Sequence, residues 1–253
     1  MKDQEENYIV KSVATYYHDK ATLYVPNTPY DKYFTGRDTR KKNGSRNNPE
    51  LNIERSLRRT RKTIRNYTKI NTFDMFATFT FKDDRENINN IKAKMNNWLK
   101  NQRKRNGKFE YLIVPEFHGD KKAIHFHALL KNYKGKLVQA INPKTNKPLK
   151  QKGRQIYNLK SYTLGFSNVV KIKDNPESHN KIATYISKYI TKDNPVFTNK
   201  NRYWVSAGLL LPLTEDNPDW DGKIKPTDSF GIDYGIIYTF SIESIKGYRG
   251  ESK

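Results

Sequence analysis

Residues 123–133 read AIHFHALLKNY, and this stretch decides how the rest of the chain is interpreted. Two histidines, His125 and His127, flank one large apolar residue inside an apolar run, which is typical of a β-strand. Successive side chains of a strand point to opposite faces, so the two imidazoles share one face and Phe126 lies on the other. Two imidazoles side by side can bind a metal ion. Taken alone, the pair is equally compatible with strand histidines that bind nothing.

The composition indicates a polyanionic partner. The 253 residues contain 48 Lys and Arg against 26 Asp and Glu, a formal net charge of +22. Nucleic acid and anionic membrane are the candidates. No apolar run approaches the roughly 20 residues of a transmembrane helix, and the N-terminus is too polar for a signal peptide. We therefore expect a cytoplasmic protein of a bacterial host with no membrane partner. Cysteine is absent, which excludes disulfides and thiolate zinc sites.

Patterns along the chain predict a central domain with an extension at each end. We expect an N-terminal extension and basic linker over 1–49, a central domain over 50–215 and a C-terminal extension over 216–253. Periodicity predicts helices over 50–70, 88–106 and 180–192, and strands over 73–81, 109–117, 125–130, 166–173 and 203–211. A further edge strand is expected within 232–242. This order predicts an α+β fold with a largely antiparallel sheet and helices packed on it.

A carboxylate upstream of the histidines completes a candidate metal site. The short connection HGDKKA at 118–123 predicts a hairpin, which places Glu116 across the turn from His125. One carboxylate and two imidazoles leave open coordination positions, as catalytic metal sites do. Mixed oxygen and nitrogen ligands suit Mg²⁺ or Mn²⁺. His118 and Asp120 are interpreted first as turn residues and second as groups that support the ligands.

A second cluster lies in ATYISKYITKD at 183–193. On a helix, its isoleucines form a stripe that faces the core: Ile182, Ile186 and Ile190. The adjoining stripe carries two phenols and two ammonium groups: Tyr185, Lys188, Tyr189 and Lys192. A tyrosine can attack phosphorus, although its pKa of about 10 requires nearby cations or a metal to ionise it. The lysines could provide that charge or hold the phosphate. An ordinary amphipathic helix with lysines that reach the solvent explains the stripe equally well.

Two basic segments are candidates for contacts with phosphate. The helix over 50–70 carries cations on its polar face: Arg55, Arg58, Arg59, Arg61, Lys62 and Arg65. Residues 131–160 contain nine Lys and Arg and no acid, among them Lys150, Lys152 and Arg154. A solvated surface is the alternative for both segments. Residues 217–253 carry five Lys and Arg against six Asp and Glu, so we do not expect the main DNA surface there.

With these segments in place, the chain resembles the HUH endonucleases. Within them it is most similar to the rolling-circle replication initiators (Rep proteins) of single-stranded DNA phages and small plasmids, of the phage gene A and gene II type. Three motifs carry the resemblance in order: FATFTF at 76–81, HFH at 125–127 and YISKYITK at 185–192, the last in a two-tyrosine form. The resemblance covers roughly residues 50–215.

The resemblance implies a five-stranded antiparallel sheet flanked by helices, with the histidines on a central strand. It implies that a metal held by Glu116, His125 and His127 polarises the scissile phosphate of single-stranded origin DNA, expected to be a hairpin. A tyrosine then attacks, leaving a 5′-phosphotyrosine and a free 3′-OH. Residues 188–192 fit the KYxxK pattern of single-tyrosine relatives, so Tyr189 is the expected nucleophile and Tyr185 its partner. A host helicase and polymerase would complete replication.

Two other functions stay open at this point. A transposase or mobilisation relaxase of the same superfamily would share the metal site, although relaxases commonly carry their tyrosines near the N-terminus. A non-catalytic DNA-binding protein with structural histidines would explain the charge of +22 equally well. The sequence does not specify the oligomeric state.

Overall fold

The computed structural model describes residues 8–9, 12–27, 30–31, 49–197, 201–232 and 235–246. The chain divides into two compact units, one formed by residues 50–210 and the other by residues 1–49 together with 211–253. The basic loop expected at 37–48 lies outside the described residues. Each unit has its own sheet and its own hydrophobic core, so each is described by itself.

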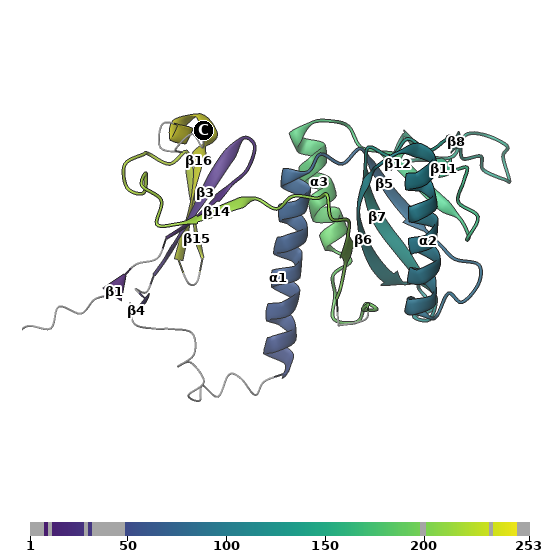
Figure 1. Cartoon of the computed structure of the whole chain (residues 1–253), viewed down its shortest axis with the longest axis horizontal. Helices are drawn as coiled ribbons and strands as arrows, with labels where there is room; N and C mark the ends of the chain where they lie inside the picture. Colours follow the sequence, from purple (N-terminus) through teal and green to yellow (C-terminus); the bar gives the residue numbers. More distant parts are fainter. Residues whose placement is uncertain are drawn as a thin grey trace, which may run out of the picture. The chain divides into compact units, whose positions relative to one another are not determined.

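The larger unit is built on an antiparallel sheet with the strand order β13-β6-β7-β5-β12-β11-β8 (Figure 1). Its strands are β5 (Met75–Phe79), β6 (Glu110–Phe117), β7 (Ile124–Lys131), β8 (Leu137–Gln139), β11 (Tyr157–Leu159), β12 (Ser167–Lys171) and β13 (Trp204–Val205). Strand β7 pairs with β5 on one side and with β6 on the other, which makes it a central strand. The predicted α+β class with an antiparallel sheet is confirmed. The sheet has seven strands rather than the expected five, because segments of two or three residues extend both edges.

Three helices cover the two faces of this sheet. They are α1 (Pro49–Ile70), α2 (Ile88–Asn106) and α3 (Pro176–Ser187). Figure 1 shows α2 on one face, and α1 with α3 on the other. Helix α2 begins where predicted because the Asn87 side chain accepts hydrogen bonds from the first-turn amides, and it ends at Gly107, whose φ of 85° favours glycine. In the part of the chain that the structure describes, none of the helices has the length and apolar character to span a bilayer.

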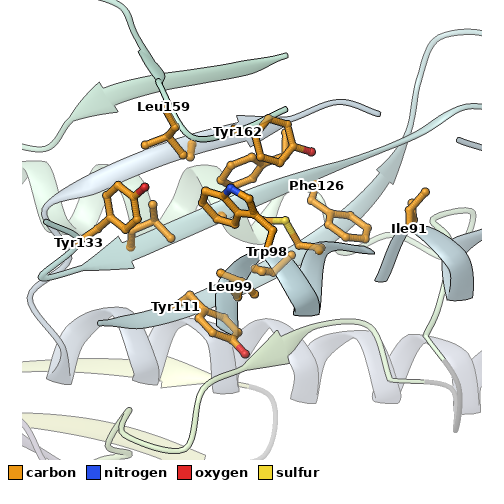
Figure 2. Close-up of a cluster of buried hydrophobic side chains, with 14 of the residues drawn as sticks. Ile91, Trp98, Leu99, Tyr111, Phe126, Tyr133, Leu159 and Tyr162 are labelled. Carbon is orange, nitrogen blue, oxygen red and sulfur yellow. The ribbon is translucent and has the colours of Figure 1, made fainter. Parts of the chain in front are cut away.

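The face under α2 is a closed aromatic core. Trp98 of α2 packs against Phe79 and Tyr162, with ring centroids 5.6 and 5.4 Å apart. Figure 2 shows this cluster, in which Phe126 of β7 also takes part. The indole of Trp98 donates to the Ser161 carbonyl at 3.1 Å, so its one polar group is satisfied. This face of the sheet is fully committed to packing.

The opposite face of the sheet packs on α1 and α3 and carries the histidines. Leu57 and Ile64 of α1 and Ile186 of α3 are buried against strand residues that include Leu112 and Leu129. The apolar stripe predicted in the tyrosine segment is therefore confirmed at Ile186. His125 and His127 alternate with core residues along β7, as the sequence predicts.

The smaller unit contains a five-stranded antiparallel sheet with the order β14-β2-β3-β16-β15. Its strands are β2 (Val13–Tyr16), β3 (Lys20–Pro26), β14 (Leu213–Asp216), β15 (Asp228–Ile232) and β16 (Gly235–Ser241). Trp220 and Phe240 form its core with Leu23, beside the short helix α4 (Ile242–Ile245). Strands from both ends of the chain thus share one sheet, and β16 lies inside it rather than at the expected edge. A separate pair joins β1 (Tyr8–Ile9) to β4 (Tyr30–Asp31).

Candidate active site

The hairpin of β6 and β7 brings the predicted ligands onto one face of the sheet. Glu116 lies directly opposite His125 in the antiparallel register, and Val114 lies opposite His127. Opposed residues in such a pair point to the same side. The carboxylate and both imidazoles therefore project together from the hairpin, on the side that carries α1 and α3.

Three ligand atoms of this group converge on one point. Glu116 Oε2 lies 2.9 Å from His125 Nε2 and 2.7 Å from His127 Nε2, and the two Nε2 atoms are 3.0 Å apart. Ligands that lie about 2.1 Å from an octahedral ion are about 3.0 Å apart when they occupy neighbouring positions. The donor set and its spacing fit a divalent metal. The protein therefore has a Glu/His group that could bind a metal ion.

The charge state of these side chains also suits a metal. Burial raises the pKa of the Glu116 carboxyl, but its hydrogen bonds and charge interactions with the two histidines outweigh this and hold the pKa below its usual value. The carboxyl is therefore ionised near neutral pH. Burial and the neighbouring His127 lower the pKa of His125, which favours the neutral imidazole. A carboxylate and a neutral imidazole are the forms that bind metals.

Thr78 orients one of the ligands and was not predicted from the sequence. It lies opposite His127 in the β5–β7 register, and its Oγ1 is 3.2 Å from His127 Nδ1. When Nδ1 donates to Thr78, the lone pair of Nε2 faces Glu116, which is the tautomer a metal ligand needs. Alternation within FATFTF could have placed Thr78 and Phe76 on one face. The cross-strand pairing that joins this face to His127 is tertiary.

Both predicted tyrosines lie beside the metal ligands. The ring of Tyr189 stacks on His127, with centroids 3.6 Å apart and planes 14° from parallel. Tyr185 meets Tyr189 edge to face at 5.4 Å, and it meets Phe76 in the same way at 5.3 Å. Tyr185 is 41% exposed, while Tyr189 is half-buried. The two phenols form one aromatic cluster with His127.

Tyr189 is not on the helix, which corrects the predicted helix over 180–192. Helix α3 begins earlier, at Pro176, where the Asn175 side chain accepts from the Ser178 amide, and it ends at Ser187. The amides of Lys188, Tyr189 and Ile190 each bond to the carbonyl three residues back, so the chain tightens into a turn. This turn presents the Tyr189 ring to His127.

Side chains from three places hold the segment that carries Tyr189. Asn194 donates to the Tyr189 carbonyl, and Arg202 Nη1 donates to the Thr191 carbonyl at 2.9 Å. Between them, Arg61 of α1 donates to the Ile190 carbonyl from Nε at 3.0 Å and from Nη2 at 2.6 Å. Three successive carbonyls that no helix satisfies thus have side-chain donors. The position of Tyr189 depends on α1 as well as on α3.

With this geometry in view, the comparison with known protein families is informative. Residues 74–194 match the model of a family of replication-associated proteins, that of the ORF2 protein and the gene II protein. The match supports a rolling-circle replication initiator type. It spans the Glu116, His125 and His127 group and both tyrosines, and it leaves α1 outside. Neither the curated proteins nor the solved structures gave a match.

The environment of Tyr189 favours the protonated phenol. Burial, Tyr185 and the Glu116 carboxylate all raise the pKa of Tyr189. The lysines that were expected to counter this are exposed; Lys188 lies beside Tyr185 in a shallow hollow on α3. Their catalytic role stays a prediction. Lys192 is exposed as well, four residues beyond the end of the helix rather than on its stripe.

The predicted phosphate-binding residues fall into three groups. On α1 the exposed cations are Arg55, Arg58, Arg59, Lys62 and Arg65, of which Arg58 pairs with Glu54 at 2.7 Å. Arg61 forms a separate case, because its guanidinium bonds to the Ile190 carbonyl; its contact with phosphate stays a prediction, as do those of the other five. Lys150 is exposed on the short strand β9 (Lys150–Gln151). Lys152 and Arg154 line a hollow together with Tyr185, so the structure places this part of the basic segment at the site.

The turn residues near the hairpin have mainly structural contacts. Asp120 Oδ1 accepts from the amides of Lys122 and Ala123 at 2.9 and 3.0 Å, which fixes the turn. The His118 ring lies 5.9 Å from the His125 ring, edge to face. Asp120 therefore behaves as the turn residue that the sequence predicts, and His118 packs beside a ligand.

Proposed function

We propose that the protein nicks and rejoins single-stranded DNA at a replication origin, through a covalent tyrosine intermediate, to initiate and terminate rolling-circle replication. One observation carries the proposal: the Tyr189 ring stacks on His127, whose Nε2 belongs to the converged Glu116, His125 and His127 group. A nucleophile that forms covalent intermediates and a set of metal ligands are thus adjacent. The family match supports the replication-initiator role.

In this proposal Glu116, His125 and His127 hold Mg²⁺ or Mn²⁺. The bound ion would polarise the scissile phosphate and favour the ionised phenol. Tyr189 Oη attacks phosphorus and the bond from phosphorus to O3′ breaks. The phenol proton passes to solvent and the departing O3′ takes up a proton, which leaves a 5′-phosphotyrosine and a free 3′-OH. The 3′-OH is the primer for a host polymerase, and a host helicase would unwind the duplex.

Tyr185 has a different place in the proposed reaction. It touches Tyr189 but is more exposed, and it borders the hollow that contains Lys152 and Arg154. We assign it the second cut, made while the first strand end is still linked to Tyr189. The lysines Lys188 and Lys192 would hold phosphate near the two phenols. The strand transfer that closes the product is the reverse of the first attack.

The test is a search for the covalent adduct. Labelled single-stranded oligonucleotides that tile both strands around the gene are incubated with the protein and Mn²⁺, and the products are separated on a denaturing gel. We expect one oligonucleotide to yield a protein–DNA band that EDTA prevents, that Tyr189→Phe abolishes and that Tyr203→Phe retains. Tyr203 is a matched control because its ring packs on Tyr67, outside the site.

Two outcomes would contradict the proposal. A band that persists in the double variant Tyr185→Phe/Tyr189→Phe would exclude both phenols as nucleophiles. Tight, salt-sensitive DNA binding with no adduct under any divalent metal would favour a non-catalytic DNA-binding protein. The nicked sequence would also separate a replication origin from the transposon ends or transfer origins that a transposase or relaxase cuts.

A further inference from the structure

A hollow of about 430 Å³ lies beside Tyr185, on the side of α3. Its wall includes Phe76 of β5, Val170 of β12 and Ile182 of α3, together with the Tyr185 ring. Ligand sites in proteins typically have volumes of roughly 300–1,000 Å³ and mostly apolar walls with a few polar groups. The metal ligands are not part of this hollow, so the proposed chemistry does not explain it.

The polar rim of the hollow comes from a small hairpin. Strands β9 and β10 (Arg154–Gln155) pair with Gln151 opposite Arg154. Their connection is Lys152 and Gly153, with φ of 49° and 76°, the left-handed conformation that a tight two-residue hairpin turn requires. The Gln155 side chain donates to the Leu149 and Ile156 carbonyls at 3.0 and 2.7 Å, which ties the hairpin to the neighbouring chain.

Every charged side chain that lines the hollow is basic. These are Lys152 and Arg154 of the hairpin and Lys181 of α3. Lys181 forms an ion pair with Glu177, so the excess positive charge comes from the hairpin. Gln151 and Ser178 add neutral polar groups. An apolar and aromatic wall under a cationic rim matches a nucleotide, which has a flat base and an anionic phosphate.

We propose that this hollow binds one nucleotide of the single-stranded DNA substrate, next to the phosphate that is cut. The base lies against Phe76 and Tyr185, and the phosphate of this nucleotide contacts Lys152 and Arg154. The proposal rests on the proposed nicking function for its substrate. It adds a position at which the enzyme selects sequence, on the Tyr185 side of the site.

Gln151 is the residue that reads the base in this proposal. A carboxamide offers one acceptor and two donors, and glutamine side chains pair with the edges of unstacked bases. Lysine and arginine at the rim hold phosphate, which carries no sequence information. We therefore expect Gln151 to determine base preference at one position, and the two cations to determine affinity for all sequences.

The test measures DNA binding by the full chain in EDTA, so that it does not depend on cleavage. The probes are the tiled oligonucleotides, and the tightest binder is then varied to all four bases at each position. The double variant Lys152→Ser/Arg154→Ser should bind this strand roughly 10- to 100-fold more weakly. The control Lys144→Ser/Lys147→Ser removes the same charge from exposed positions of the same segment that do not line the hollow.

Base preference gives the second readout. In the wild-type protein we expect one position with a clear preference, and Gln151→Ala should reduce it severalfold with little change for the other positions. A 2-aminopurine placed at that position should lose fluorescence on binding, because it stacks on the aromatic wall. The quenching should be absent in Lys152→Ser/Arg154→Ser at equal occupancy.

The outcomes separate this inference from the nicking proposal. Equal loss of binding in the hairpin variant and its charge control, or an unchanged base preference in Gln151→Ala, would overturn the nucleotide site even if the wild-type protein forms the adduct. Conversely, a hairpin-specific loss of binding without any adduct would keep the nucleotide site and contradict nicking. Binding of a peptide instead of DNA would appear as no change in affinity for any oligonucleotide, which also overturns the inference.

Discussion

The two faces of the seven-stranded sheet use the same strand, β7, for different purposes. On the α2 face, Phe126 is fully buried in an aromatic cluster. On the other face, His125 and His127 alternate with core positions and leave their Nε2 atoms directed at Glu116. One face maximises burial, whereas the other interrupts its core to present polar atoms. The comparison teaches that strand alternation alone separates stability from chemistry, and variants on β7 can test that separation.

The largest effect is expected from removing both histidines. His125→Ala/His127→Ala should lower adduct formation by roughly 1,000-fold or more, because the metal contributes several kcal/mol to phosphate chemistry. A second readout needs no DNA: at about 100-fold excess over its Kd, Mn²⁺ should stabilise the wild-type fold by about 2.7 kcal/mol and the variant not at all. Thermal unfolding with and without Mn²⁺ measures this. Loss of DNA binding and of the folded state together would mean that the histidines support the fold.

A large effect of the opposite kind is expected one residue away. Phe126→Ala should lower the free energy of unfolding by about 3–5 kcal/mol, since it leaves a cavity in a closed core. Urea denaturation measures the loss, and Phe126→Leu is the milder control. Where the variant stays folded, Mn²⁺ should still bind. A variant that keeps its stability but loses the metal would show that the two faces are not separable.

A smaller effect is expected at Arg61, which joins α1 to the tyrosine segment. Arg61→Ala removes two donors from the carbonyl of Ile190, a residue that is 1% exposed, and adduct formation should fall roughly 10- to 100-fold. Arg61→Lys should not restore the rate, because an ammonium does not reproduce the planar fork. Single-turnover kinetics and DNA affinity are measured together. The neighbouring exposed Lys62→Ala is the control, and full rescue by lysine would favour a phosphate contact instead.

The smallest effect is expected at Thr78. Thr78→Val keeps the shape and removes the hydroxyl beside His127 Nδ1, so Mn²⁺ affinity should fall about tenfold. Thr78→Ser should retain the affinity. Thr80→Val is the matched control, because its hydroxyl contacts Phe166 rather than a histidine. Calorimetric titration with Mn²⁺ measures all three, and equal affinities in Thr78→Val and wild type would exclude the orienting role.

The sequence predicts the parts of the site that depend on neighbouring residues. Alternation along 123–133 and a short turn place His125, His127 and Glu116 on one hairpin face, and both rules act within a dozen residues. Helices α1 and α2 follow their periodicity and caps for the same reason. These local signals are sufficient to find a metal-binding group.

The parts that were missed depend on distant residues. The turn that takes Tyr189 off α3 has its carbonyls satisfied by Arg61, Asn194 and Arg202, which no periodicity in 180–192 reveals. The hydroxyl of Thr78 reaches His127 only through the β5–β7 register. In the same way, the basic segment at 131–160 gives no sign from its sequence that its hairpin lies beside Tyr185.

The sheet of the smaller unit has a consequence for biosynthesis. Strands β2 and β3 leave the ribosome first, but their outer partners β14 and β16 come from residues after 212. During translation, the β2–β3 pair would have two unpaired edges while residues 50–210 acquire their own core. The catalytic unit can therefore fold before synthesis ends, whereas the terminal sheet must wait for the last strands. Ribosome-bound chains stopped just after residue 210 should show this order as a protease-resistant central fragment with a sensitive N-terminal segment.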